Sequence, residues 1–277
     1  MEVRDSMCRM GFVSSNRNNE YTSYIRNATS FYGKTQKDGM GYAYAVGGDM
    51  AFFKTPESAP SYWETHPEFQ RIKTKSIVFH TRIASTGAVV FKNTHPFVAN
   101  NVAMAHNGML SGYSKIKDEL KAGGYVFQSD TDSEVLIGAY LIHGDNFLNY
   151  LAEKGLMGTL TVMILTPARL LVYTNNSAMV VYRRLQNGVR ELYGASDVML
   201  LGGYGARYLD NDVLYEVKEG VITAVRKVPV RRWGTRVTEV SNVPFRSSDY
   251  WGKFMKRKKR DESDDFDDNG NYRFGGF

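Results

Sequence analysis

The sequence is poor in cysteine: Cys8 is the only one among its 277 residues. A single thiol excludes an internal disulfide framework, the usual device of small secreted proteins, so we expect a cytoplasmic protein. Long hydrophobic runs are also missing, because no stretch reaches the roughly eighteen uncharged apolar residues that a membrane-spanning helix needs. The first seven residues contain Glu2, Arg4 and Asp5 and lack the apolar segment of a secretory signal. We therefore interpret residues 1–7 as a short leader or propeptide and expect no membrane attachment.

A strong charge of one sign is missing as well. The net charge is +6, and the surplus is spread thinly along the chain. A basic block at 256–260 is followed by an acidic block at 261–268, and the two nearly cancel. We therefore do not expect a nucleic-acid partner. Because residues 245–277 carry these blocks and few apolar side chains, we predict a disordered charged tail there and a single domain over 8–244.

The position of Cys8 suggests a nucleophile. It follows an internal methionine, Met7, and leads directly into the apolar segment 9–13. If Cys8 were the first residue of the mature chain, its free α-amino group, with a reference pKa of about 8, would take up the thiol proton. The alternative is that Cys8 is a small buried hydrophobic residue, as most free cysteines are. Position alone leaves both interpretations open.

The pattern of apolar residues predicts an α+β domain built on antiparallel sheets. In the first part, a polar turn at 14–19 follows the first strand. The expected strands and helices there are strands 9–13, 76–81 and 102–106, a hairpin over 42–54, and helices 21–32, 111–122, 130–141 and 146–154. Beyond Gly158 the sequence changes to short β-rich segments separated by Asn, Gly and Asp turns, namely 159–165, 169–173, 178–184, 189–193, 198–201, 213–217 and 221–225.

Polar residues suited to chemistry follow two of these expected strands and open one helix. Arg82 follows strand 76–81, and its guanidinium matches the two oxygens of a carboxylate, although a surface ion pair is the ordinary alternative. Asn107 and Gly108 end strand 102–106, where they offer the donors of an oxyanion hole or form a simple type I′ turn. Asp132, at a helix start, is either a first-turn acid or an acceptor for a substrate ammonium group.

Taken in order, these segments resemble the class II glutamine amidotransferase domain of the N-terminal-nucleophile (Ntn) hydrolases. The opening Met-Cys-Arg is most similar to the stand-alone members of that family. The residues that carry the resemblance are Cys8, His80–Gly87 (HTRIASTG), Asn93–Phe97 (NTHPF), Ala105–Gly108 (AHNG) and Thr131–Glu134 (TDSE). The resemblance implies a four-layer α/β/β/α sandwich of antiparallel sheets, the Ntn-hydrolase fold, with no metal ion and no cofactor.

The resemblance also assigns roles to the matching positions. Cys8 would attack the side-chain amide carbon of L-glutamine and form a thioester, while its own α-amino group moves the proton. Asn107 and the backbone N–H of Gly108 would hold the oxyanion. On the substrate side, the family pattern has Arg82 binding the α-carboxylate, Ser85 contacting the substrate through its hydroxyl, and Asp132 accepting from the α-ammonium group. No phosphosugar-binding or ATP-binding motif follows the domain, so we expect a separate synthetase subunit to accept the ammonia.

Two departures from the family pattern keep alternatives open. Residues 34–39 (KTQKDG) have no arginine where many relatives have one, which would fit hydrolysis of another γ-glutamyl or amide bond. A non-catalytic binding or scaffold protein that keeps the fold is a further alternative. The leader is the second departure, because removal of Met1 exposes Glu2 and not Cys8. Either translation begins at Met7 or the chain cleaves itself between Met7 and Cys8.

Overall fold

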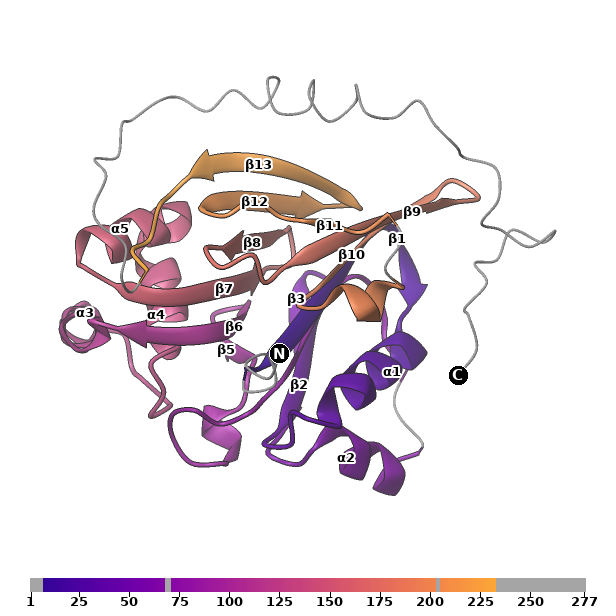
Figure 1. Cartoon of the computed structure of the whole chain (residues 1–277), viewed down its shortest axis with the longest axis horizontal. Coiled ribbons are helices and arrows are strands. Elements are labelled where there is room, and N and C mark those ends of the chain that lie inside the picture. Colours follow the sequence, from indigo (N-terminus) through magenta and orange to yellow (C-terminus); the bar gives the residue numbers. More distant parts are fainter. Residues whose placement is uncertain (1–6, 68–70, 203–204, 233–277) are drawn as a thin grey trace. The chain divides into compact units, whose positions relative to one another are not determined.

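The computed structural model describes residues 7–67, 71–202 and 205–232. The expected tail at 245–277 and all but the last residue of the expected leader lie outside these ranges. The described residues form two antiparallel sheets with helices beside each of them (Figure 1). In these ranges no helix is long and apolar enough to cross a membrane.

The first sheet has seven strands in the order β11-β9-β10-β1-β4-β2-β3. Its strands are β1 (Arg9–Glu20), β2 (Met40–Val46), β3 (Asp49–Thr55), β4 (Lys73–Thr81), β9 (Val180–Gln186), β10 (Val189–Ala195) and β11 (Arg207–Tyr208). Helices α1 (Thr22–Gly33) and α2 (Ala59–Thr65) lie beside it (Figure 1). Ile25 of α1 and Trp63 of α2 pack in one apolar cluster with Phe79 of β4. This cluster fixes the outer helical layer on the sheet, because burying these side chains removes apolar surface from water.

The second sheet has six strands in the order β13-β12-β8-β7-β6-β5. Its strands are β5 (Phe97–Ala99), β6 (Val102–Ser111), β7 (Met157–Leu165), β8 (Leu170–Thr174), β12 (Val213–Lys218) and β13 (Val221–Lys227). Its helices are α3 (Tyr113–Ala122), α4 (Glu134–His143) and α5 (Phe147–Glu153). Leu136, Phe147 and Ile164 belong to the apolar cluster that joins these helices to the sheet. The predicted α+β fold with two antiparallel sheets is therefore confirmed.

Several local predictions were wrong. The segment 14–19 is not a polar turn, because β1 continues to Glu20 and pairs with β4 on one side, with a register shift after Ser14. Ser14 and Ser15 of this segment are buried, whereas Arg17 and Asn18 are exposed. The Ser14 hydroxyl accepts from the N–H of Gly220 at 3.1 Å. Residues 198–201 form a 3₁₀ helix, η3 (Val198–Leu201), because the Asp197 side chain accepts from the N–H of Met199 at 2.8 Å and caps the turn.

The short elements α2, β5 and β11 were not predicted. For α2 the sequence does hold a signal, since Ser58 is its N-cap, accepting from the N–H of Ser61, and Pro60 lies in its first turn. Helix α3 begins at Tyr113 after Gly112, two residues later than expected.

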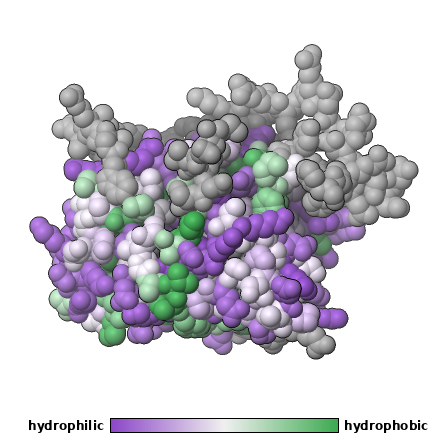
Figure 2. Space-filling view, turned by 60° about the horizontal axis from the view of Figure 1, so that its bottom comes forward, coloured by the Kyte–Doolittle hydropathy of each residue, from purple (hydrophilic) through white to green (hydrophobic). Residues whose placement is uncertain are grey.

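The face that Figure 2 brings forward is mainly hydrophilic with small apolar patches between the charged residues. Among the described residues, Val89, Val90 and Phe91 are three consecutive exposed apolar side chains. They lie in the connection between β4 and β5, which also lines the pocket beside Cys8.

Candidate active site

The nucleophile candidate is placed by a central strand. Cys8 directly precedes β1, and the antiparallel pairing of Arg9 with Thr81 brings it beside the end of β4. The residues after β4 meet it there: the Cys8 thiol donates to the carbonyl of Ile83 at 3.3 Å, and the Ile83 N–H donates to Sγ at 3.4 Å. Two segments that are 75 positions apart in the chain thus hold one sulfur atom between them.

The loop after β4 is held by Arg82 and Asp38. Arg82 Nη1 donates to the carbonyl of Ala88 at 3.0 Å, and Nη2 donates to the carbonyls of Thr86 and Gly87 at 2.8 and 3.3 Å. Because a guanidinium has five N–H donors, two remain for a ligand or for solvent. The Asp38 carboxylate accepts from the N–H of Ala84 at 2.7 Å. Among the described residues Arg82 forms no ion pair, which counts against the alternative interpretation as a surface ion pair; the residue is buried and bonds to its own loop.

The second sheet contributes Asn107 and Gly108 to the site, and both residues lie within strand β6. Strand β6 runs through both residues to Ser111, so the expected strand end and the alternative type I′ turn were both wrong. Asn107 is 2% exposed, and among the described residues its Nδ2 group has no hydrogen-bond partner. A buried donor left unpaired costs free energy, which makes it a functional candidate. Gly108 has a φ of 144°, and an added Cβ would lie 1.9 Å from the carbonyl oxygen of Thr159.

Asp132 precedes helix α4 and is not in its first turn. Its Oδ2 accepts from the N–H of Leu110 at 2.7 Å, and its Oδ1 accepts from the Ser133 hydroxyl at 3.2 Å. The first-turn acid of the helix is Glu134, so that alternative interpretation of Asp132 was wrong. Glu134 instead accepts from the N–H groups of Gln128 and Ser129 at 2.7 and 2.6 Å, which fixes the turn that carries Asp132.

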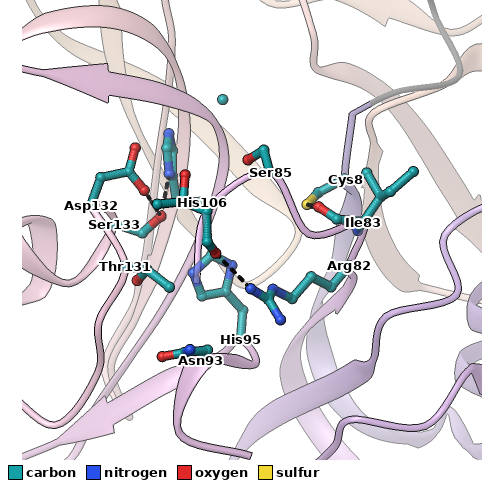
Figure 3. Close-up of a pocket in the computed structure, with 12 residues that line it drawn as sticks. Cys8, Arg82, Ile83, Ser85, Asn93, His95, His106, Thr131, Asp132 and Ser133 are labelled. Carbon is teal, nitrogen blue, oxygen red and sulfur yellow. Dashed lines mark hydrogen bonds between the residues drawn. The ribbon is translucent and has the colours of Figure 1, made fainter. Parts of the chain in front are cut away.

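These side chains line one pocket, drawn in Figure 3. Five of the six residues predicted for the site line it; Asn107, the neighbour of Gly108 in the chain, is not among the lining residues. Cys8, Arg82 and Ile83 lie on one side of the pocket, and Asp132 and Ser133 lie on the other (Figure 3). The full lining consists of Cys8, Arg82, Ile83, Ser85, Thr86, Asn93, His95, His106, Gly108, Thr131, Asp132 and Ser133. The pocket therefore offers a thiol and a cation opposite a carboxylate.

Three buried histidines lie at the pocket, where His95 and His106 belong to its lining, and they join the two sheets. His80 of β4 lies with Nε2 at 3.1 Å from the carbonyl oxygen of His106 in β6 and at 3.2 Å from Nδ1 of His95. His106 contacts the Ser133 hydroxyl at 2.9 Å. Burial lowers the pKa of His80 to about 3 and also lowers the pKa of His95 and of His106. All three are therefore neutral at pH 7.

The thiol of Cys8 is also neutral at this pH. Desolvation by burial raises its pKa, and this effect outweighs the lowering by the Ile83 N–H and by the positive charge of Arg82. Since the thiolate is the reactive form of cysteine, the thiol needs a base beside it. In the chain with Met7 attached, the nitrogen of Cys8 is a peptide nitrogen and is not basic.

Sequence reasoning missed several pocket residues that the quoted motifs already contained. Thr131 and Ser133 belong to the TDSE segment, and Asn93 and His95 belong to NTHPF. The Asn93 side chain accepts from the N–H of Asp130 at 3.0 Å and donates to the carbonyl of Ala88 at 3.1 Å, so it links the loop after β4 to the turn before α4. A pattern search that asks for one role per motif overlooks such linking residues.

The sandwich of two antiparallel sheets between helical layers is the Ntn-hydrolase fold, with Cys8 at the start of a central strand. The chain belongs to the class II glutamine amidotransferases, since residues 7–193 match the model of that family. The predicted family membership is confirmed.

Similar proteins support the same assignment. A glutamine–fructose-6-phosphate aminotransferase of Buchnera aphidicola (subsp. Baizongia pistaciae) is 34% identical over 152 residues, which cover 53% of this chain and 23% of that protein. An amidophosphoribosyltransferase of Archaeoglobus fulgidus is 34% identical over 115 residues, covering 38% of this chain and 25% of that protein. The matched part is thus about a quarter of the length of these relatives.

Solved structures share the fold. The glutamine phosphoribosylpyrophosphate amidotransferase of B. subtilis superposes with a TM-score of 0.62 at 21% identity, over 79% of this chain and 49% of that one. A glutamine aminotransferase class-II domain protein of Silicibacter pomeroyi gives a TM-score of 0.53 at 14% identity, over 80% of this chain and all of that one. At these identities the likeness concerns the fold alone.

Proposed function

We propose that the protein releases ammonia from the side-chain amide of L-glutamine through a thioester on Cys8, after Cys8 has become the first residue. The observation that carries this proposal is the pocket itself, in which Cys8, Arg82 and Asp132 come together from three distant segments. L-glutamine is a zwitterion with a side-chain amide. Its recognition needs a cation for the carboxylate, an anion for the ammonium group and a nucleophile at the amide carbon.

In this reaction Cys8 supplies both nucleophile and base. Its α-amino group takes the thiol proton, Sγ bonds to the amide carbon, and the protonated amine passes the proton to the departing nitrogen, which leaves as ammonia. Water then attacks the thioester, the C–S bond breaks, and glutamate leaves. Asn107 Nδ2 and the N–H of Gly108 stabilise the negative oxygen in both steps. Loss of one such donor typically costs about 10²–10³-fold in rate.

The substrate contacts follow from the two sides of the pocket. Arg82 retains two N–H donors beyond its bonds to the loop carbonyls, and these would take the α-carboxylate. Asp132 would accept from the α-ammonium group, because its carboxylate is already oriented by Leu110 and Ser133. The Ser85 hydroxyl, at the rim, would add a further polar contact. We also propose that the domain spans 8–244 and acts in the cytoplasm, and that a synthetase subunit on another chain accepts the ammonia.

The test is labelling with a glutamine-like electrophile. We expect covalent modification of Cys8, a mature N-terminus at Cys8, and protection from labelling by L-glutamine, with no labelling of the Cys8→Ala protein. Active material whose N-terminus remains at Met1 would refute the terminal-amine mechanism. Turnover of γ-glutamyl amides without turnover of glutamine would instead support the alternative hydrolase, and full biological activity of Cys8→Ala would support a scaffold role.

A further inference from the structure

One buried amide lies outside the glutamine pocket and contacts the peptide bond next to Cys8. Gln36, in the segment after α1, is 1% exposed, and its Nε2 donates to the carbonyl oxygen of Met7 at 3.3 Å. That carbonyl belongs to the Met7–Cys8 peptide bond. The peptide bond that must be broken to free the amine of Cys8 therefore has a carbonyl oxygen that already accepts a hydrogen bond from a buried side chain.

The orientation of this amide is fixed by its neighbours. The Thr35 hydroxyl donates to Gln36 Oε1 at 2.8 Å, and the N–H of Gln36 donates to the carbonyl of Tyr32 at 3.0 Å. A flipped amide would place Oε1 against the Met7 carbonyl oxygen, two acceptors facing each other, and would turn the NH₂ group toward the Thr35 hydroxyl. The hydrogen-bond pattern thus keeps the NH₂ group directed at the peptide carbonyl.

We propose that Gln36 is a catalytic residue for self-cleavage of the Met7–Cys8 bond, in which its Nε2 group stabilises the negative charge that develops on the Met7 oxygen. This inference rests on the proposed function, which requires Cys8 to become the first residue. It assigns to the chain a second set of oxyanion donors. Gln36, after the end of α1, donates to the carbonyl of Met7. Asn107 and Gly108, in β6, would donate to the oxygen of the substrate amide.

The reaction is balanced with water as the sole co-reactant. Sγ of Cys8 bonds to the carbonyl carbon of Met7 through a five-membered ring, and the thiol proton moves to the nitrogen of Cys8 as the C–N bond breaks. The products of this step are a thioester and a free α-amine. Water then attacks the thioester carbon and the C–S bond breaks, which leaves a Met7 carboxylate and a free thiol on Cys8.

The surroundings of Cys8 suit this step. The Ile83 N–H donates to Sγ at 3.4 Å and stabilises negative charge on the sulfur as it attacks. A neutral amide donor stabilises the oxygen without adding a charge that would have to be desolvated before the reaction. Once the leader has left, Nε2 of Gln36 loses this acceptor and remains beside the new amine.

The experiment monitors cleavage in the full chain made by cell-free synthesis, with the intact mass measured over time. We compare the wild type with Gln36→Met, which keeps the volume and removes the donor, and with Gln36→Glu, which replaces the donor by an acceptor. Gln186→Glu on β9 is the matched control. Circular dichroism and the unfolding temperature report folding of each variant.

We expect the wild type and Gln186→Glu to lose residues 1–7 at the same rate and both Gln36 variants to cleave about 10²-fold more slowly. Hydroxylamine, which attacks thioesters, should accelerate cleavage of the wild type. Equal cleavage of a folded Gln36→Met protein would overturn the role of Gln36 and leave self-cleavage intact. A wild type that stays uncleaved even with hydroxylamine would overturn both the role of Gln36 and self-cleavage. The glutaminase proposal is tested separately, by labelling of Cys8 in chains that begin at Cys8.

Discussion

The pocket residues are held mainly by the main chain. The thiol of Cys8 bonds to both polar groups of Ile83, Arg82 bonds to three carbonyls of its own loop, and Asp132 accepts from the N–H of Leu110. Leu110 lies in strand β6, and the loop that carries the other partners is itself held by the bond from the Ala84 N–H to Asp38. Each reactive group is therefore oriented before a ligand arrives, which is the condition for efficient electrostatic stabilisation of a transition state.

Asn107 offers a direct test at this scale. We expect Asn107→Ala to lower kcat for glutamine hydrolysis about 10²–10³-fold with little change in KM, because the oxyanion exists only in the transition state. Steady-state kinetics on protein that begins at Cys8 measures both constants. Asn101→Ala, on an exposed turn, is the control and should keep both. An unchanged kcat in folded Asn107→Ala would remove this residue from the mechanism.

Residue types were predictable from the sequence, but their partners were not. Each of Cys8, Arg82, Ser85, Gly108 and Asp132 lines the pocket, as the motifs suggested. The guanidinium of Arg82 bonds to carbonyls of its own loop because that loop folds back on itself. The periodicity of the sequence does not predict the conformation of such a loop.

At the scale of elements, both strands that carry the site are longer than the sequence suggested. Strands β1 and β6 were expected to stop where their apolar residues stop, at Ser14 and at Asn107. Both continue because their backbones stay paired: β1 pairs with β4 as far as Glu20, and β6 pairs with β7 as far as Ser111. The polar side chains of Ser14, Ser15 and Asn107 are buried there. Apolar alternation detects strands whose faces differ in exposure, and it fails where a strand crosses a polar interior.

Strand β6 also depends on one glycine. We expect Gly108→Ala to destabilise the protein by about 2–3 kcal/mol, because a Cβ would clash with the Thr159 carbonyl and a φ of 144° is strained for other residues. Gly47→Ala, in the β2–β3 turn, is the matched control: its φ is also positive, at 60°, but there is nothing within 4 Å of the added Cβ. We expect a cost of about 1 kcal/mol there.

Urea unfolding monitored by circular dichroism compares the two variants. Equal losses in the free energy of unfolding would mean that the Thr159 contact costs nothing and that β6 adjusts its position. The wild type and both variants need to show a single, superimposable transition for this comparison.

At the scale of the whole molecule, the two sheets meet through neutral histidines. His80, His95 and His106 are all nearly inaccessible to solvent, at 0%, 5% and 2% exposure. Unfolding returns them to the ordinary histidine pKa of about 6.5. Below that value the unfolded chain binds protons that the folded protein does not bind, so the free energy of unfolding falls as the pH falls.

For His80, whose folded-state pKa is about 3, the free energy of unfolding decreases from about pH 6.5 down toward pH 3. Each such histidine contributes about 1.4 kcal/mol per pH unit across its window. Urea unfolding at several pH values between about 6.5 and 4.5 measures the slope. His80→Gln should reduce the slope by about that amount; a slope that His80→Gln does not alter would contradict the assignment.

The sandwich as a whole was predictable only through the resemblance to a known family, which five ordered motifs carry. Composition and alternation alone predicted only antiparallel sheets with helices. Short elements such as β5 and β11 were not predicted, because a segment of two or three residues is too short to show a periodic pattern of apolar residues. The motifs of this chain do not identify the proposed acceptor of the ammonia, and the matched part spans about a quarter of the length of these relatives.

The place of Cys8 directly before β1 has a practical consequence. Strand β1 lies between β10 and β4, so its first residue is held at a fixed place in the sheet. If Cys8 becomes the first residue as proposed, an affinity tag fused ahead of Met7 would be lost with the leader, and a tag that stayed would block the amine. Purification and immobilisation should therefore use a tag at the other end of the chain.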